Sequence, residues 1–482
     1  MPSWFWPTLT GFNYAIAIAT IVTILRRRKP PASMLAWIFA ILLVPVLGVL
    51  TYLLIGDTRI RRQARKRRRK RLVIARALSR HAGALAPMHA DRHPRRLSSQ
   101  IQGLVKIATK IGQEPPIRGN EVVIYHDADR TLSSLRVAIG EAKSHVHLEY
   151  YIFQPDDTGR AVRDALIEKA REGVKCRLLL DAIGCWRMSR SFIRTFRDAG
   201  VEVAFFQPFR LNARLFRLNC RNHRKLVVID GRVGFTGSQN IGDEYRGLEK
   251  KFGPWRDTHM RITGPGAAQL QEVFIEDWHF ATGRDIADDE SLFPPLEAVG
   301  DSVVQFVGTG PDRPSGVLHL LLLAAFSAAS ESISIITPYF VPDMAVVLAL
   351  KAAALRGARV QLLIPARTDN RVVLWAGRSY YAELIESGVE IYEYDHGMLH
   401  SKVVIIDDKW SLVGSANMDV RSFNINFEIT GLLYDDALSY ELAVDFAALR
   451  DRARRFSSNV ESHWTFVESL VNGMARLAAP LL

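Results

Sequence analysis

Residues 222–230 read NHRKLVVID and residues 237–240 add GSQN; residues 399–407 read LHSKVVIID and residues 414–417 add GSAN. In both copies the Lys lies two residues after the His, the Asp seven after it and the Asn seventeen after it. A single His-x-Lys is a weak signal, but the same spacing of His, Lys, Asp and Asn rarely occurs twice in one chain by chance. The stretch predicts an internal duplication with one functional motif in each half.

The apolar residues of each copy predict a buried strand, over 227–229 and 403–406. Because side chains two apart on a strand point to the same face, each copy presents an imidazole beside an ammonium group. Ser238 and Asn240, or Ser415 and Asn417, arrive from the turn that follows. Such donors hold phosphate oxygens while one His attacks phosphorus and the other protonates the leaving oxygen. The duplication argues against the alternative of two solvated strand ends.

The pattern H-x-K-x4-D with a trailing G-S-x-N resembles the phospholipase D superfamily, and within it the chain resembles the bacterial cardiolipin synthases. The resemblance covers nearly the whole chain. It includes two apolar N-terminal segments, the stretch 339–342 (YFVP) and the stretch 421–428 (RSFNINFE). The paired motifs are specific for the superfamily and less specific for the exact reaction.

The resemblance implies a two-step phosphatidyl transfer between two phosphatidylglycerol molecules, with cardiolipin and glycerol as products. His223 is expected to be the nucleophile and His400 the acid and base, although the symmetric local sequences also allow the reverse. Lys225, Lys402, Asn240 and Asn417 are expected to hold the phosphoryl oxygens. The catalytic motif residues implied in this way are His223, Lys225, Asp230, His400, Lys402 and Asp407.

Two acidic residues are expected to orient the imidazoles, again by resemblance. Asp257 lies 34 residues after His223, and Glu428 lies 28 residues after His400. Asp230 and Asp407 stand at the far ends of their strands, so a role in the scaffold is favoured for them over contact with phosphate. Tyr151 and Tyr339 follow equivalent strands and are candidates to line the pocket.

The location of the charge excludes some function classes. The formal net charge is +13, but residues 26–29 and 59–71 contain fourteen Lys and Arg and no acidic residue. The remaining chain is close to neutral, which argues against a nuclease with a broad basic groove. The three cysteines form neither a metal-binding spacing nor a disulfide framework, which indicates a reducing compartment. No cluster has the spacing of a metal site, so neither a metal nor another cofactor is expected.

Two uncharged runs, over 1–25 and 30–56, predict a two-helix membrane anchor. Pro45 leaves a kink or a re-entrant hairpin open. The basic block 59–71 predicts a cytoplasmic catalytic body at the bacterial inner membrane and also suits anionic headgroups. The basic residues 26–29 conflict with that orientation for a two-span hairpin.

An internal repeat predicts an α/β fold made of two pseudo-twofold-related sandwich halves of the phospholipase D type. The stretches 142–156 and 329–343 correspond, and each is followed by a helix that ends at Gly173 or Gly357 and by a further strand. The pseudo-twofold would bring His223 and His400 into one site. The expected domains are an anchor (1–56), a basic connector (57–115), the two halves (116–295 and 296–450) and an amphipathic tail (451–482).

Two peripheral segments allow alternative interpretations. Aromatic and basic residues alternate between Val203 and Cys220, which suits either the headgroup region of a membrane or ordinary loop packing. In the tail, Trp464, Val467, Leu470, Val471 and Met474 recur at helical spacing. Core packing is the favoured interpretation of that face.

Competing functions remain at this point. A phospholipase D hydrolase, or a transferase that uses another alcohol, would share every motif. A membrane-tethered nuclease or nucleic-acid binder would use the basic block as its arm, and a non-catalytic scaffold would not need both motifs intact. The oligomeric state is not predicted.

Overall fold

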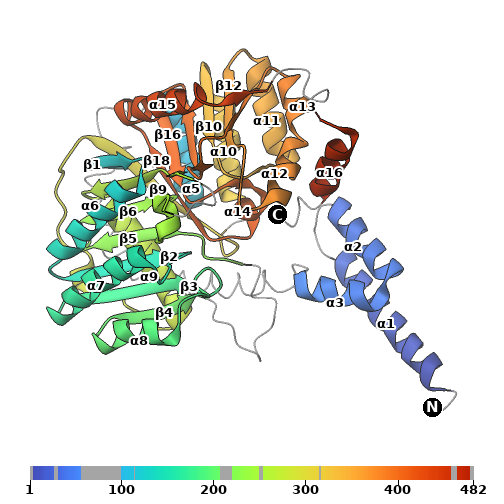
Figure 1. The fold of residues 1–482 in the computed structure, drawn as a ribbon, viewed down its shortest axis with the longest axis horizontal. Helices are drawn as coiled ribbons and strands as arrows, with labels where there is room; N and C mark the ends of the chain where they lie inside the picture. The colour runs from blue at the N-terminus through green and yellow to red at the C-terminus, as the bar shows by residue number, and fades with distance from the viewer. Residues whose placement is uncertain are drawn as a thin grey trace. The chain divides into compact units, whose positions relative to one another are not determined.

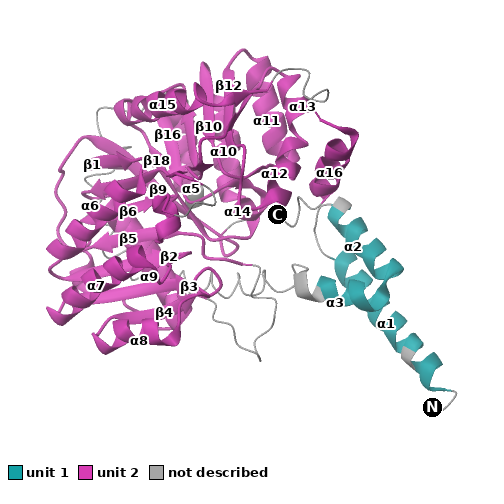
Figure 2. Ribbon diagram, in the orientation of Figure 1, with its two compact units in different colours: residues 1–66, 209–219 teal, residues 67–208, 220–482 magenta. Residues whose placement is uncertain are grey.

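The computed structural model describes residues 4–26, 31–55, 99–112, 114–206, 220–248, 253–313, 316–456 and 464–477. They belong to two compact units, one with the N-terminal helices and one with both motif copies (Figures 1 and 2). The basic block 59–71 and residues 27–29 lie outside the described residues. So does most of the aromatic and basic segment, because only its first residues, Phe205 and Phe206, are described, in a strand.

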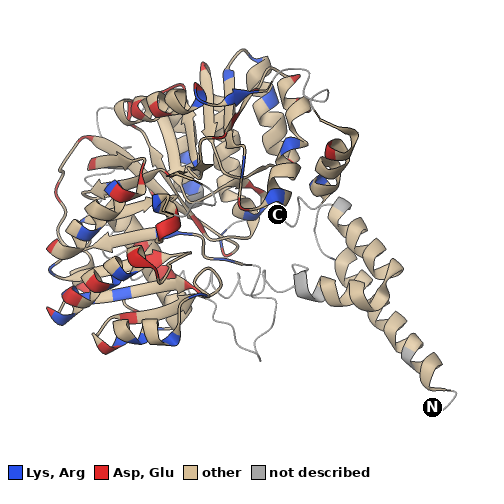
Figure 3. Ribbon diagram, viewed as in Figure 1, with Lys and Arg blue, Asp and Glu red and all other residues tan. Residues whose placement is uncertain are grey.

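The N-terminal unit consists of helices α1 (Phe5–Leu25), α2 (Pro31–Leu43) and α3 (Pro45–Ile55), which carry no Lys, Arg, Asp or Glu (Figure 3). Among the described helices, only α1 is long and apolar enough to cross a membrane. The second predicted span is divided because Pro45 lacks an N–H and starts a new helix. Gly48 permits the close bend, since a Cβ there would lie 2.5 Å from the carbonyl oxygen of Ala40. The predicted two-helix anchor is therefore not confirmed.

In the unit with both motif copies, the described residues form one sheet of fifteen strands whose order is nearly mirrored about its middle. From the centre outward, the first half runs β1, β8, β6, β5, β2, β3, β4, and the second half runs β9, β18, β16, β15, β10, β12, β13. Parallel and antiparallel pairings also agree between the halves. The two halves meet where β1 pairs with β9, so the predicted duplication and α/β class are confirmed.

The elements of each half follow the same order along the chain. Helix α5 (Ser99–Gly112) precedes the first half. The first half contains β1 (Ile117–Tyr125), α6 (Ala128–Glu141), β2 (His145–Tyr150), α7 (Asp157–Arg171), β3 (Lys175–Asp181), α8 (Arg190–Asp198), β4 (Glu202–Phe206), β5 (Lys225–Ile229), β6 (Val233–Gly237), the 3-10 helix η4 (Asp243–Arg246), β7 (Trp255–Arg256), β8 (His259–Thr263), α9 (Ala267–Thr282) and η5 (Glu290–Leu292). The second half contains β9 (Ser302–Thr309), α10 (Val317–Ala328), β10 (Ser332–Ile336), β11 (Phe340–Val341), α11 (Met344–Leu355), β12 (Arg359–Pro365), α12 (Arg371–Arg378), α13 (Tyr381–Ile385), β13 (Glu390–Tyr394), β14 (Met398–Leu399), β15 (Val403–Ile406), β16 (Trp410–Gly414), β17 (Met418–Asp419), α14 (Val420–Asn424), β18 (Glu428–Leu433), α15 (Asp436–Arg450), β19 (Arg454–Arg455) and α16 (Phe466–Leu477).

Helices cover the sheet and enclose the apolar core. In the first half, α9 contacts β4, β5 and β6, while α7 packs on β3 and against α6 and α8. In the second half, α15 contacts β10, β13, β15 and β16, while α11 packs on β12 and against α10 and α13. The motif strands β5 and β15 are fully buried, as their apolar sequences predict. The core therefore fixes the two strands that deliver the motif residues.

The predicted helix ends at Gly173 and Gly357 are confirmed. Their φ angles are 91° and 98°, in the region that favours glycine. In each case the next residue donates its N–H back into the helix, from Val174 to the Lys169 carbonyl and from Ala358 to the Ala353 carbonyl. The repeat is thus preserved down to its capping turns.

The tail helix α16 does not pack as predicted. Its buried residues are Asn472 and Ala475, whereas Val467, Leu470 and Met474 are exposed. Of the five predicted residues, Val471 is half-buried, and Trp464, just before the helix, packs against the large apolar core of the second half. Helical spacing identified an apolar face but not the side of the helix that meets the protein.

Three buried histidines, His145, His147 and His259, lie in strands of the first half. The Nε2 atom of His145 lies 3.1 Å from Oε1 of Gln271, whose Nε2 lies 3.0 Å from Nδ1 of His147. Burial lowers the pKa of His145 to about 4 and that of His259 to about 4, and it lowers the pKa of His147 well below its ordinary value. These rings are therefore neutral in the folded protein at pH 7.

Folding stability is expected to fall as the pH is lowered from about 6.5 to about 4. Histidines of the unfolded chain bind protons near pH 6.5, and the folded chain resists protonation until about pH 4. The stabilisation is therefore complete above pH 6.5 and is lost on acidification. Unfolding of the full chain in detergent as a function of pH measures the slope. His145→Gln should flatten it and the exposed His396→Gln should not; equal slopes in all three proteins would contradict the assignment.

Candidate active site

Each motif histidine is held by the main chain of the opposite half. The N–H of His223 donates to the Phe427 carbonyl at 2.9 Å, and the N–H of His400 donates to the Arg256 carbonyl at 2.8 Å. Beside these bonds, Asn222 bridges to Phe427, and β14 pairs with β7. The two motif copies are therefore positioned by matching short pairings between the halves.

The two predicted acids bind the imidazoles in a crossed arrangement. Oε2 of Glu428, from the second half, lies 2.9 Å from Nδ1 of His223. Oδ1 of Asp257, from the first half, lies 2.7 Å from Nδ1 of His400. The crossing follows from the backbone pairing, because each acid comes directly after the residue that accepts the histidine N–H. Each half therefore completes the site of the other.

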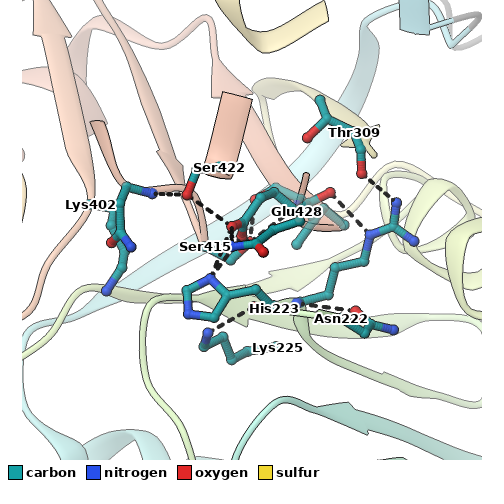
Figure 4. A network of polar contacts seen from close by, with 12 residues as sticks. Asn222, His223, Lys225, Thr309, Lys402, Ser415, Ser422 and Glu428 are labelled. Carbon is teal, nitrogen blue, oxygen red and sulfur yellow. Dashed lines mark hydrogen bonds and ion pairs between the residues drawn. The ribbon is translucent and has the colours of Figure 1, made fainter. Parts of the chain in front are cut away.

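The motif serines bind these carboxylates. The hydroxyl of Ser415 donates to Oε2 of Glu428 at 2.5 Å, and that of Ser238 donates to Oδ1 of Asp257 at 2.6 Å (Figure 4 for Glu428). Ser422 and Asn426 also donate to Glu428, at 3.0 and 3.3 Å. The motif serines, for which the sequence pattern indicated contact with phosphate, therefore each hold a carboxylate in the structure. Ser422 and Asn426 were not singled out from the sequence, although both lie in the RSFNINFE stretch.

The electrostatics favour neutral imidazoles beside charged carboxylates. Burial lowers the pKa of His223 to about 4 against the attraction of Glu428, and burial also lowers that of His400. Burial alone would raise the pKa of Asp257, but His400, Lys402 and Ser238 together lower it to about 2. The pKa of Glu428 is lowered against burial by His223, Lys225 and Ser415. An anionic carboxylate only accepts, so each Nδ1 donates and each Nε2 is left as the ring nitrogen available for chemistry.

The motif lysines are buried and close in space. Each ammonium donates to the carbonyl of its own motif histidine, Lys225 to His223 at 2.7 Å and Lys402 to His400 at 2.6 Å. Burial and the nearby Lys402 lower the pKa of Lys225 well below its ordinary value, and burial lowers that of Lys402 to about 8. An anionic ligand beside these two amino groups would favour their charged forms, so the pair is suited to an anion.

The residues between His and Lys break the symmetry of the two copies. Arg224 is buried and donates to the carbonyls of Glu428 and Thr309, both at 3.0 Å, and it forms an ion pair with Asp277. Ser401 takes its place in the second copy and lies 3.0 Å from the Thr258 hydroxyl. Arg224 was not singled out from the sequence. It lies between His223 and Lys225, so strand alternation places its side chain on the opposite face from theirs, toward the body of the protein.

Asp230 and Asp407 bind backbone N–H groups at the start of a neighbouring strand, the kind of scaffold contact that their strand-end positions favoured. Asp230 accepts from the N–H groups of Lys143, Ser144 and His145 at 2.7–2.9 Å. Asp407 likewise accepts from residues 330–332, at 2.7–3.1 Å, and also from the Ser330 hydroxyl. Each aspartate thus holds the start of strand β2 or β10 beside its motif strand, and neither lines the cavity described next.

A cavity of about 530 Å³ joins the two motif histidines. Tyr151 and Tyr339 line it, as do Asn240 and Asn417. The amide of Asn240 is engaged with the Tyr245 hydroxyl at 2.9 Å. The described residues contain no group of three or more His, Cys, Asp or Glu that could hold a metal ion. The other lining residues come from both halves: Ile152, Arg221, Glu244, Tyr245, Trp255, Val341, Asp369, Asn370, Val373, Asp419, Arg421 and Asn426.

Comparison with known proteins finds relatives along the whole chain. The family profile described as "Cardiolipin synthase, PLD-like domain" matches residues 135–278 and 322–450, and "Phospholipase_D-nuclease N-terminal" matches residues 15–56. A cardiolipin synthase of Geobacillus kaustophilus is 39% identical over 97% of this chain and 92% of its own. One of Alkalihalophilus pseudofirmus is 37% identical over 100% of this chain and 95% of its own. A phosphatidylserine synthase structure from Haemophilus influenzae shares the fold, with a TM-score of 0.60, 15% identity and coverage of 79% of this chain and 100% of that one.

Replacing Asp407 by Asn is expected to destabilise the protein by about 2 kcal/mol, because an amide N–H₂ would face backbone donors. Activity per folded molecule should stay within a few-fold, since Asp407 does not line the cavity. Denaturant unfolding and a rate normalised to folded protein measure the two effects. Asp408→Asn at the exposed neighbouring position is the matched control. A large rate loss in a stable Asp407→Asn protein would assign that aspartate to catalysis instead.

Proposed function

The chain belongs to the cardiolipin synthase family of phospholipase D-like proteins, and we propose that it transfers a phosphatidyl group from one phosphatidylglycerol to another, giving cardiolipin and glycerol. The enzyme class is phosphatidyltransferase, and the substrates are phospholipids. The observation that carries the proposal is one cavity lined by both motif histidines, each with its Nδ1 held by a buried carboxylate.

In the first step, Nε2 of His223 attacks the phosphorus of the donor lipid. A P–N bond forms and the P–O bond to the headgroup glycerol breaks. His400 is neutral in the empty site, but the negative charge of the bound phosphate, together with Asp257, favours its protonated form. Protonated His400 gives its Nε2 proton to the leaving oxygen, so that glycerol departs neutral. Lys225 and Lys402 lie beside the two rings, and their charge offsets the negative charge that builds on the phosphoryl oxygens.

In the second step, the headgroup of a second phosphatidylglycerol occupies the place of the departed glycerol. Nε2 of His400 takes the proton of its hydroxyl, and the oxygen attacks phosphorus. The new P–O bond forms as the P–N bond to His223 breaks. His223 is neutral again and His400 is protonated, so the cycle closes without a cofactor.

The hydrogen bonds around Glu428, the partner acid of His223, favour the assignment of His223 as the nucleophile. Besides His223, Glu428 accepts from Ser415, Ser422 and Asn426. These donors keep the carboxylate anionic, which fixes the Nδ1–H tautomer and exposes the Nε2 lone pair. Among the described residues, Asp257 accepts side-chain hydrogen bonds from His400 and Ser238 alone. This leaves more of its negative charge to stabilise a protonated His400.

A membrane location fits the lipid substrate and the apolar helix α1. The excess of Lys and Arg in residues 59–71 favours a catalytic unit on the cytoplasmic side of the bacterial inner membrane. With its second apolar segment divided at Pro45, the anchor is proposed to cross once or to enter and return, and α1 is the segment best suited to cross.

A hydrolase would use the same residues with water as the acceptor. Incubating the purified full chain with phosphatidylglycerol alone separates the two activities. We expect cardiolipin and glycerol in equal amounts, and no more than traces of phosphatidic acid. Phosphatidic acid as the main product would replace the transferase with a phospholipase D, and inactivity of His223→Ala and His400→Ala confirms that the measured reaction belongs to this site.

The roles of the two histidines can be separated with a donor whose leaving group is p-nitrophenol, because that group departs without a proton. His400→Ala should then release one equivalent of p-nitrophenol in a burst and accumulate a lipid-linked His223, located by mass spectrometry. His223→Ala should lose the burst, with a rate reduction on the order of 10⁴. A burst in His223→Ala with the lipid on His400 would reverse the assignment.

A further inference from the structure

Helix α16 attaches to the catalytic unit through its small and polar face. Ala475 is buried in a cluster with Val341, Val373 and Ala376. Arg476 donates to Oε1 of Glu383 at 2.9 Å, and its guanidinium lies 4.3 Å from the ring centroid of Tyr380. The helix is thus seated by specific contacts, chiefly on α12.

The opposite face of α16 carries large apolar side chains that are directed outward. At 3.6 residues per turn these side chains form one stripe, roughly opposite Asn472 and Ala475. A helix of a soluble protein normally turns such a stripe inward, so the arrangement indicates an apolar partner outside the catalytic unit. The stripe consists of Phe466, Val467, Leu470, Met474 and Leu477, which are 54–83% exposed.

The stripe lies on the outer side of the cavity wall. Val341 and Val373 line the cavity and share the apolar cluster of Ala475. Asn370, which caps the start of α12, lines the cavity as well. A ligand that covers the stripe therefore lies close to the element that borders the active site.

The first half also exposes large apolar side chains next to cavity-lining residues. Trp186 is 74% exposed, and the neighbouring Cys185 donates its thiol to the carbonyl of Tyr151, which lines the cavity. Leu248 is 59% exposed and follows the 3-10 helix that holds Tyr245 in the cavity wall. Apolar side chains are therefore exposed beside the cavity on both halves.

We propose that α16 is an interfacial helix, whose stripe enters the boundary between headgroups and acyl chains of the bilayer and holds the cavity at the lipid surface. The choice of a lipid partner rests on the proposed function, because the substrate of the cavity is a phospholipid. An apolar stripe opposite an attached face is the geometry of helices that lie in the membrane plane. A phospholipid confined to the bilayer then reaches the site without leaving the membrane surface.

The test places a fluorophore on the stripe in the full chain. Leu470→Cys and Met474→Cys are labelled with bimane in proteoliposomes of phosphatidylglycerol and phosphatidylcholine with brominated acyl chains. The native cysteines are buried, and labelled wild-type protein gives the background. We expect bromine to quench both labels. The controls are Ser469→Cys, on another face of α16, and Val137→Cys, on α6 at the far side of the catalytic unit (Figure 1), and both should be quenched less.

Unquenched labels on the stripe overturn the proposal. If the emission is also shifted to the blue, a protein surface covers the stripe, either another part of this chain or a second copy. Quenching equal to that of the Ser469→Cys control overturns it as well, because the stripe would then have no preferred contact with lipid.

A kinetic measurement tests the consequence for the active site. Leu470→Ser combined with Met474→Ser should lower the rate on vesicles while leaving the rate on detergent-dispersed phosphatidylglycerol unchanged, and Ser469→Ala should change neither. Equal losses in vesicles and detergent would indicate a folding defect and contradict the proposal. Wild-type protein that makes no cardiolipin would refute the proposed function, whereas the quenching result does not depend on activity.

Discussion

The active site depends on one interaction that occurs twice: a histidine of one half binds a carboxylate of the other half. His223 takes Glu428 and His400 takes Asp257, and in both cases a backbone hydrogen bond one residue earlier sets the register. A shift of one residue in either short pairing would turn the carboxylate to the other face of its strand. Neither half can therefore form an oriented imidazole alone, and the large sheet that joins the halves through β1 and β9 is part of the catalytic apparatus.

The duplication places two chemically similar rings at one cavity, and the differences around them allow different tasks. Arg224 donates to the backbone carbonyl of Glu428, the partner acid of His223, and forms an ion pair with Asp277. Its counterpart Ser401 is uncharged, accepts from the Thr258 hydroxyl and donates to the Arg256 carbonyl at 3.3 Å. Glu428 accepts from three side chains besides His223, and among the described residues Oδ2 of Asp257 has no hydrogen-bond partner. Two symmetric halves with unequal contacts around their histidines thus allow one histidine to act as the nucleophile and the other as the acid.

Burial gives the site its preference for an anion. Burial lowers the pKa of both motif lysines, and the charge of Lys402 lowers the pKa of Lys225 further. A lipid phosphate entering the cavity would relieve that repulsion and restore the charged forms, so binding and protonation are coupled. A transferase must exclude water from its covalent intermediate more strictly than a hydrolase does. An interfacial α16 would add to this exclusion by keeping the cavity at the lipid surface.

The sequence by itself determined the duplication, the motif strands and the capping glycines. All of these follow from local rules, namely strand and helix periodicity and fixed spacing within a motif. It did not determine that each acid binds the histidine of the other half. The partners lie 205 and 143 residues apart in the sequence, and the sequence equally allowed each acid to bind the motif histidine of its own half. Periodicity likewise revealed the apolar face of α16 but not its direction. Only the tertiary structure decided these points, because they depend on which surfaces of distant segments meet.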